Sequence, residues 1–134
     1  MARNIKIGDI GDYAADQFDK LLKAAVFETD KRVKLASPVL TGRFRASWAI
    51  GQNAAPFEGV PEGSYPTPPP PNAVNYQLGQ EKAGNVYSIH NNLNYAEPLA
   101  GGSSKQAPGP WVDGIAKDIQ TWINSEADRI GRQS

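Results

Sequence analysis

A proline-rich stretch, residues 53–72, limits what this chain can fold into more than any other feature of the sequence. It contains seven of the eleven prolines, and proline offers no backbone N–H to a helix or to a sheet ladder. Stretches of this kind favour extended polyproline conformations. We therefore expect an arm or loop inserted within a single domain, 1–134, with regular structure before and after it.

The composition of this arm fits two roles. A disordered linker is one of them, because prolines and small residues bury little apolar surface. A docking arm is the other, because stiff apolar residues lose little conformational entropy when they dock. The contacts that such an arm offers are Phe57, Val60, Tyr65, Pro68 and Pro69.

Before the arm, the sequence predicts one helix and one strand. Apolar residues recur at three- and four-residue spacing over residues 10–36, and the Ser37-Pro38 pair ends that pattern. Residues 43–51 then alternate between apolar and mostly polar side chains, which is typical of a strand with one covered face. The expected core face carries Phe44, Ala46, Trp48 and Ile50, and the opposite face carries Arg43, Arg45, Ser47 and Ala49.

After the arm, residues 72–85 weakly favour a short helix, and residues 85–92 alternate like a second strand. A loop rich in glycine, serine and proline follows over residues 94–110, and residues 111–130 carry an apolar stripe at helical spacing. The expected class is α+β, with a small antiparallel β-sheet packed against a long N-terminal helix and a C-terminal helix.

The overall charge excludes attraction to nucleic acid or to an anionic membrane over a long range. Fourteen basic and fourteen acidic side chains cancel, so only local charge could bind such partners. The chain has no cysteine, which removes disulfides and thiolate sites. It also shows no apolar run long enough for a signal peptide or a membrane span, so we expect a protein made in the cytosol without membrane contact.

The sequence offers no enzyme, metal or cofactor site. The single histidine, His90, has no serine elbow near it, and the carboxylates show no ligand spacing. Residues 101–105, GGSSK, lack the spacing of a phosphate loop. Arg43 and Arg45 leave alternatives open, because a basic pair can hold an anion or nucleic acid but more often pairs with carboxylates of a helix or of a neighbouring subunit.

Two separated segments together resemble a known family. SPVLTGRFRASW, residues 37–48, is similar to a Pro-x-Asp-Thr-Gly-x-hydrophobic-Arg-x-Ser pattern, and residues 86–112 resemble its partner pattern. Both patterns belong to the neck and tail-completion proteins of tailed double-stranded DNA bacteriophages, which include minor tail proteins of the lambda Z kind. The matching residues of the second segment are Asn91, Asn92, Tyr95, Ala96, Ser104, Gln106, Ala107 and Pro108.

The chain departs from the family pattern at two places. Leu40 stands where the family usually has aspartate, and the acidic residue expected just before the glycine of the second segment is displaced to Glu97. The resemblance spans roughly residues 10–125, and the proline-rich arm is an insertion within it.

The resemblance implies a structural virion protein without enzymatic activity or cofactors. Such a protein forms a homo-oligomeric ring, expected as a hexamer, at the head-tail neck. It contacts portal-side connector proteins and tail-tube or terminator proteins, and DNA passes through its channel without sequence-specific binding. The alternatives are a tail-tube terminator and a DNA-binding accessory protein that uses Arg43, Arg45 and Lys105.

The resemblance and the arm together define the residues that we expect at subunit or partner contacts. They are Arg43, Arg45, Phe57, Tyr65, Pro68, Pro69, Asn91, Asn92, Tyr95, Ser104, Lys105, Gln106, Pro108 and Trp111.

Overall fold

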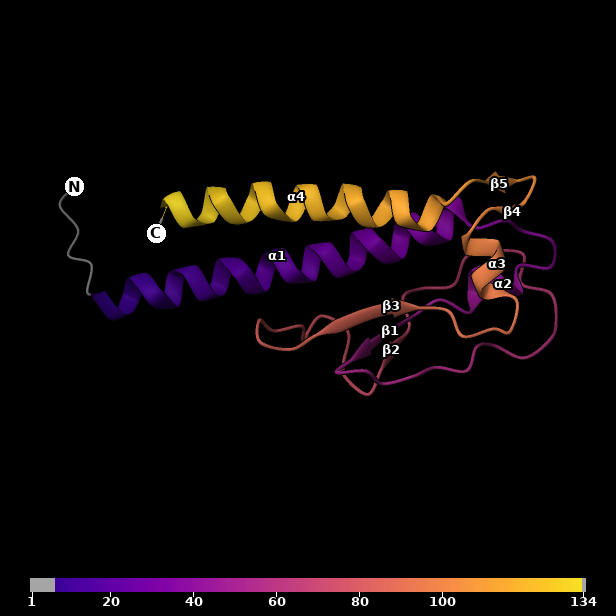
Figure 1. Ribbon diagram of the computed structural model, residues 1–134. Helices are drawn as coiled ribbons and strands as arrows, with labels where there is room; N and C mark the ends of the chain where they lie inside the picture. The colour runs from indigo at the N-terminus through magenta and orange to yellow at the C-terminus, as the bar shows by residue number, and fades with distance from the viewer. Residues whose placement is uncertain (1–6, 134) are drawn as a thin grey trace.

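Two long helices form the frame of the molecule. The computed structural model describes residues 7–133, and the side chains of residues 15–132. Helix α1, Ile7–Ala36, lies antiparallel to helix α4, Trp111–Gln133, and Figure 1 shows α1 between α4 and a small sheet. Both helices were predicted from apolar spacing, and both predictions are confirmed.

The sheet contains three short strands in the order β2-β1-β3. Strand β1, Ala49–Gln52, pairs antiparallel with β3, Tyr87–His90, and parallel with β2, Ala73–Val74. The α+β class and the second predicted strand are thus confirmed. The sheet is mixed because the proline-rich segment leaves the end of β1 and comes back beside its beginning, so that β2 runs in the same direction as β1 (Figure 1).

The prediction of a strand over residues 43–51 is wrong for its first half. Helix α2, Arg43–Ala46, makes a single turn there, with the Ala46 N–H donating to the Gly42 carbonyl at 2.8 Å. A helical turn places residues four apart on one side, so Phe44 and Trp48 meet without a strand. Ser47 and Ala49, expected on the outer face, are fully buried.

Residues 72–85 do not form the predicted helix. They contain β2 and then turns, because Asn75, Gly79 and Gly84 all have positive φ angles, which end helical geometry. The predicted loop over residues 94–110 does contain regular structure. Its elements are helix α3, Ala96–Ala100, and the hairpin of β4, Ser103–Ser104, with β5, Ala107–Pro108.

The core lies where α1 ends and α4 begins. Its buried members come from α1, from the α2 segment and from the residues after β3. Trp48 contacts Trp111 of α4, with ring centroids 6.4 Å apart, so the core joins both halves of the chain. The buried cluster is Val33, Phe44, Trp48, Leu93 and Ala96.

Candidate functional site

The two segments that resemble the phage family lie together in space. Asn91, directly after β3, donates from Nδ2 to the carbonyl of Phe44 at 2.8 Å. Its Oδ1 accepts the N–H of Leu93 at 3.3 Å. Asn91 therefore gives the Phe44 carbonyl of α2 a second donor beside the Ser47 N–H, and it fixes the turn after β3 at the same time. We call residues 37–48 and 91–111 the motif end of the molecule.

A second clamp joins the motif end through Gln106. The Val39 N–H donates to Gln106 Oε1 at 2.9 Å, and Gln106 Nε2 donates back to the Val39 carbonyl at 3.0 Å. Ser104 Oγ in turn accepts the Gln106 N–H at 3.1 Å. A paired amide contact of this kind mimics two bonds of a sheet ladder, and it fixes the β4–β5 hairpin against the loop between α1 and α2.

Aromatic rings fill the interior beneath these clamps. The centroid of the Phe44 ring lies 5.7 Å from that of Trp48 and 6.4 Å from that of Trp111. Tyr95 completes the cluster at 6.5 Å from Phe44. The indole N–H of Trp111 donates to the Leu99 carbonyl at 2.8 Å, so this half-buried tryptophan is satisfied within its own chain.

Arg43 and Arg45 contact the proline-rich segment. We call residues 57–71 the strap, because they lie outside the helices and strands and are bonded to the body at several places. Arg43 Nε donates to the Val60 carbonyl at 3.0 Å, and Arg45 Nη2 donates to the Tyr65 carbonyl at 3.1 Å. Neither arginine has a carboxylate partner in these bonds, and each uses its charge to hold a main-chain oxygen.

The N–H groups of the same strap residues are also bonded. The Val60 N–H donates to Ser47 Oγ at 3.1 Å, and the Tyr65 N–H donates to the Thr41 carbonyl at 2.6 Å. Gly42 lets the strap approach this closely, because a Cβ at that position would overlap the Tyr65 carbonyl oxygen.

The start of the strap is held by the end of β3. The Phe57 N–H donates to His90 Nε2 at 3.0 Å, and Asn92 Nδ2 donates to the Phe57 carbonyl at 3.1 Å. His90 Nε2 is the acceptor of the Phe57 N–H. Its Nδ1 faces Ser88 Oγ at 3.2 Å. The single histidine thus has a structural contact.

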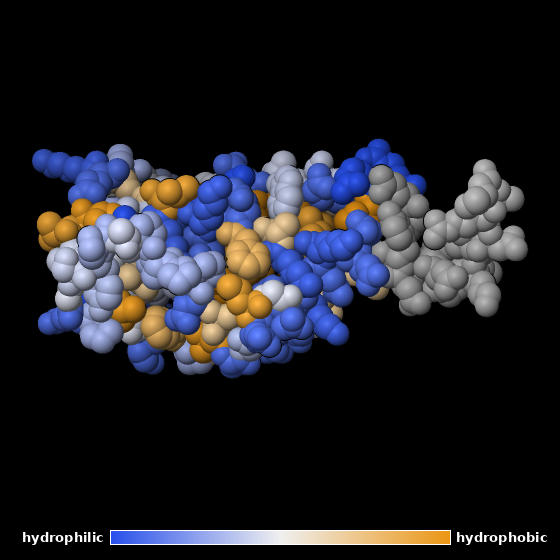
Figure 2. All heavy atoms as spheres, turned by 180° about the vertical axis from the view of Figure 1, so that it is seen from behind, coloured by the Kyte–Doolittle hydropathy of each residue, from blue (hydrophilic) through white to orange (hydrophobic). Residues whose placement is uncertain are grey.

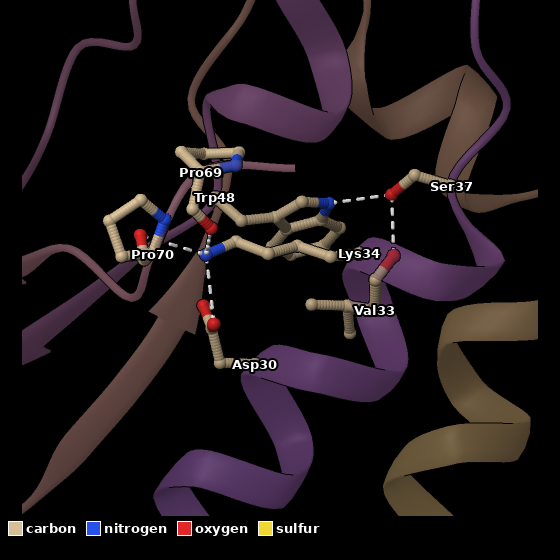
Figure 3. A network of polar contacts seen from close by, with 7 residues as sticks. All are labelled: Asp30, Val33, Lys34, Ser37, Trp48, Pro69 and Pro70. Carbon is tan, nitrogen blue, oxygen red and sulfur yellow. Dashed lines mark hydrogen bonds and ion pairs between the residues drawn. The ribbon is translucent and has the colours of Figure 1, made fainter. Parts of the chain in front are cut away.

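The far end of the strap covers a buried ion pair, shown in Figure 3. Lys34 Nζ lies 2.8 Å from Asp30 Oδ2 and donates to the carbonyls of Pro69 and Pro70 at 3.3 and 3.4 Å. Burial raises the pKa of Asp30, and the hydrogen bond and charge of Lys34 oppose that rise. Beside this pair, the Trp48 indole N–H donates to Ser37 Oγ, which donates to the Val33 carbonyl.

The motif end also exposes apolar side chains. Leu40 is 96% exposed, and the groove next to it is lined by Val39, Phe44, Tyr95 and Leu99 among others. In the view from behind, hydrophobic residues form small separate patches, and they reach the left-hand end of the molecule, where the motif end lies (Figure 2). Leu40 and this groove offer apolar surface that another protein could cover, and Phe27, Leu35 and Val86 are exposed outside the motif end.

The predicted contact residues thus occupy three kinds of place. Ser104, Lys105 and Pro108 lie on the β4–β5 hairpin, where Lys105 and Pro108 are exposed. Pro68 and Pro69 line a second groove with the half-exposed Phe27 and other residues of α1. The remaining predicted residues, namely Arg43, Arg45, Phe57, Tyr65, Asn91, Asn92, Tyr95, Gln106 and Trp111, join the strap and the motif segments to each other.

Sequence reasoning missed the buried charges. The only signal for Asp30 and Lys34 was their spacing of four residues on the helix, which is equally typical of an exposed pair. Glu81 is fully buried, and its Oε2 accepts the Gly79 N–H at 3.3 Å. Burial raises the pKa of the neighbouring Tyr76, and the carboxylate of Glu81 adds to that rise. No sequence pattern marked this turn.

The described part of the chain contains no group of three histidine, aspartate or glutamate side chains arranged to hold a metal ion. Within residues 7–133, no helix has both the length and the apolar character needed to cross a membrane. No protein-family model, curated protein or solved structure matches the chain.

Proposed function

We propose that this chain is a structural protein of a tailed double-stranded DNA bacteriophage. Copies of it form a ring at the neck, complete the tail and join it to the head connector, and leave a channel for DNA. One observation supports this proposal more strongly than the others. The two segments that resemble the neck family are far apart in the sequence, yet Asn91 bonds Phe44 and Gln106 bonds Val39, as expected if they form one functional unit.

The surface chemistry supports assembly with other proteins. Leu40 is almost fully exposed at the motif end, and burying it against a partner would remove that apolar surface from water. Arg43 and Arg45 hold the strap in place beside it. The balanced charge of the chain also suits a ring, because a net charge would repeat in every copy and repel its neighbours.

Depletion of the protein from a producing phage tests this function. Particles made without it should accumulate as separate heads and tails, and the added protein should restore joined particles. Electron microscopy counts both forms. Joined particles at normal yield in its absence would exclude the proposal, and a ring seen only on the tail tube would reassign the chain as a tube terminator.

A matched pair of variants tests the surface. Leu40 and Val86 are both exposed apolar residues, at 96% and 71%, but Val86 lies before β3, away from the motif end. Leu40→Ser should reduce the yield of joined particles, whereas Val86→Ser should leave it unchanged. Equal yields from both variants would show that the motif end is not the contact surface.

A further inference from the structure

The strap lies on the body as a bound extended peptide would. Phe57, Val60 and Tyr65 each have both the main-chain N–H and the main-chain carbonyl bonded to the body. No residue of the strap belongs to a strand, so these contacts stand in for a sheet ladder. We call the body residues that make them the track, namely Thr41, Arg43, Arg45, Ser47, His90 and Asn92.

The turn at the root of the strap is strained. Asn53 and Ala54, just before it, have φ angles of 54° and 68°, in the left-handed region. Asparagine tolerates that region, but alanine does not, because its Cβ approaches the carbonyl oxygen. Beyond the strap, Asn75 also has a positive φ, of 61°. Folding the strap back onto its own body therefore stores strain at a short hinge, and such hinges favour exchange between copies.

We propose that neighbouring copies of this chain exchange the strap, so that residues 57–65 of one copy occupy the track of the next. A second copy offers the same bonding atoms, so exchange loses none of these hydrogen bonds, while Ala54 is free to leave the left-handed region. Exchange of identical segments is a low-cost route to oligomers. The stiffness of the prolines limits the entropy lost when the strap crosses to another copy.

The length of the segment limits the crossing. Phe57 lies five residues after Gln52 of β1, and Tyr65 lies four residues before Pro69, whose carbonyl Lys34 holds. An extended chain spans at most about 3.5 Å per residue, so the exchanged residues reach about 17 Å from β1 and about 14 Å from Pro69. Exchange therefore requires neighbouring copies whose tracks face each other across the contact. A contact in which each copy gives a strap to one neighbour and receives one from the other is directional, and directional contacts form a ring when the rotation between copies closes and a filament when it does not. The proposal rests on the proposed ring.

Mixed-isotope cross-linking tests the exchange. Copies with a photoreactive phenylalanine analogue in place of Phe57 are mixed before assembly with nitrogen-15-labelled copies without it. Mass spectrometry of the irradiated rings should find the probe joined to labelled peptides that contain His90 and Asn92. The same probe at Val86, on the exposed body, controls for chance proximity between copies.

The outcomes separate the two proposals. Rings in which the probe joins only peptides of its own unlabelled copy would overturn the exchange and leave the ring intact as a function. A chain that native mass spectrometry and electron microscopy show never to assemble would overturn both.

A variant of the hinge provides a second measurement. Ala54→Gly removes the strain of the closed turn and should favour the strap on its own body, weakening self-association roughly fivefold. Ala55→Gly is the matched control, because Ala55 is not among the residues with positive φ, and it should change association less. Sedimentation velocity measures both, and an unchanged association constant for Ala54→Gly would contradict the role of the hinge.

Discussion

The paired helices and the motif end are held together in different ways. In the helix pair, many side-chain bonds are local, as between Glu28 and Arg32 or between Glu126 and Arg129, although Asp19 and Lys34 also bond backbone groups outside the helices. At the motif end, side chains bond backbone groups far away in the sequence, as Gln106 does with Val39. The helices can begin to form from local sequence alone, whereas the motif end exists only when both halves of the chain are folded. Matched substitutions in the two regions test this difference.

The largest expected effect is at Trp48, which packs in the aromatic cluster and bonds Ser37. Trp48→Ala should lower the free energy of unfolding by about 3–5 kcal/mol, because it leaves a cavity and removes the indole donor from the buried Ser37 hydroxyl. The half-buried Trp122 of α4 is the control in the helix pair, and Trp122→Ala should cost about 1–2 kcal/mol. Urea unfolding measures both, and equal losses would remove the distinction between the regions.

The second effect is at Lys34, which links α1 to the strap. Lys34→Met should cost roughly 3 kcal/mol, because it leaves the buried Asp30 carboxylate and the Pro69 and Pro70 carbonyls without their donor. The double variant Asp30→Asn/Lys34→Met should recover part of the loss, since no unpaired charge remains. A double variant less stable than Lys34→Met would contradict this account.

The third prediction compares two glycines whose replacement by alanine should change the stability in opposite directions. Gly42→Ala should cost about 2 kcal/mol, because alanine is strained at a φ of 86° and its Cβ would displace the strap at Tyr65. Gly114 lies in α4 with open space around it, so Gly114→Ala should stabilise the protein by up to about 1 kcal/mol. Thermal unfolding of the two variants should shift in opposite directions.

A smaller effect compares two glutamines. Gln106→Ala removes both bonds to Val39 and should cost about 1 kcal/mol. Gln120 bonds Asn124 one turn away on exposed α4, so Gln120→Ala should cost no more than about 0.5 kcal/mol. Chemical denaturation measures both losses of unfolding free energy, provided that this free energy falls with denaturant concentration at the same slope in both variants. A larger loss for Gln120→Ala than for Gln106→Ala would contradict the prediction.

The smallest effect is a change in pH dependence. Because burial raises the pKa of Asp30 above its ordinary value of 3.8, the folded protein binds this proton more readily than the unfolded chain. The contribution of Asp30 to stability is therefore least favourable at neutral pH and improves as the pH falls toward 4. The unfolding free energy of wild type relative to Asp30→Asn should rise over that range, and a fall would show that Lys34 outweighs the burial.

Prediction from the sequence worked where local pattern and final structure agree. The apolar spacing of α1 and α4 and the alternation around Ile89 were sufficient to predict these elements, although all four residues of β3 are only half-buried. It failed over residues 43–46, because alternation across so few residues also fits one helical turn that places Phe44 and Trp48 on one side. It failed again over residues 72–85, where turn residues outweighed a weak helical pattern.

The sequence by itself determined the two helices, the α+β class and the lack of helix and strand in the strap, because helical spacing and proline's missing N–H act within a few residues. Only the tertiary structure decided what Arg43 and Arg45 hold, how Lys34 is buried and where Gln106 bonds. The partners of these side chains are backbone groups 17 to 67 residues away, at Val60, Tyr65, Pro69, Pro70 and Val39. Any residue supplies such a carbonyl or N–H, so the sequence does not mark the partner, and the path of the chain selects it.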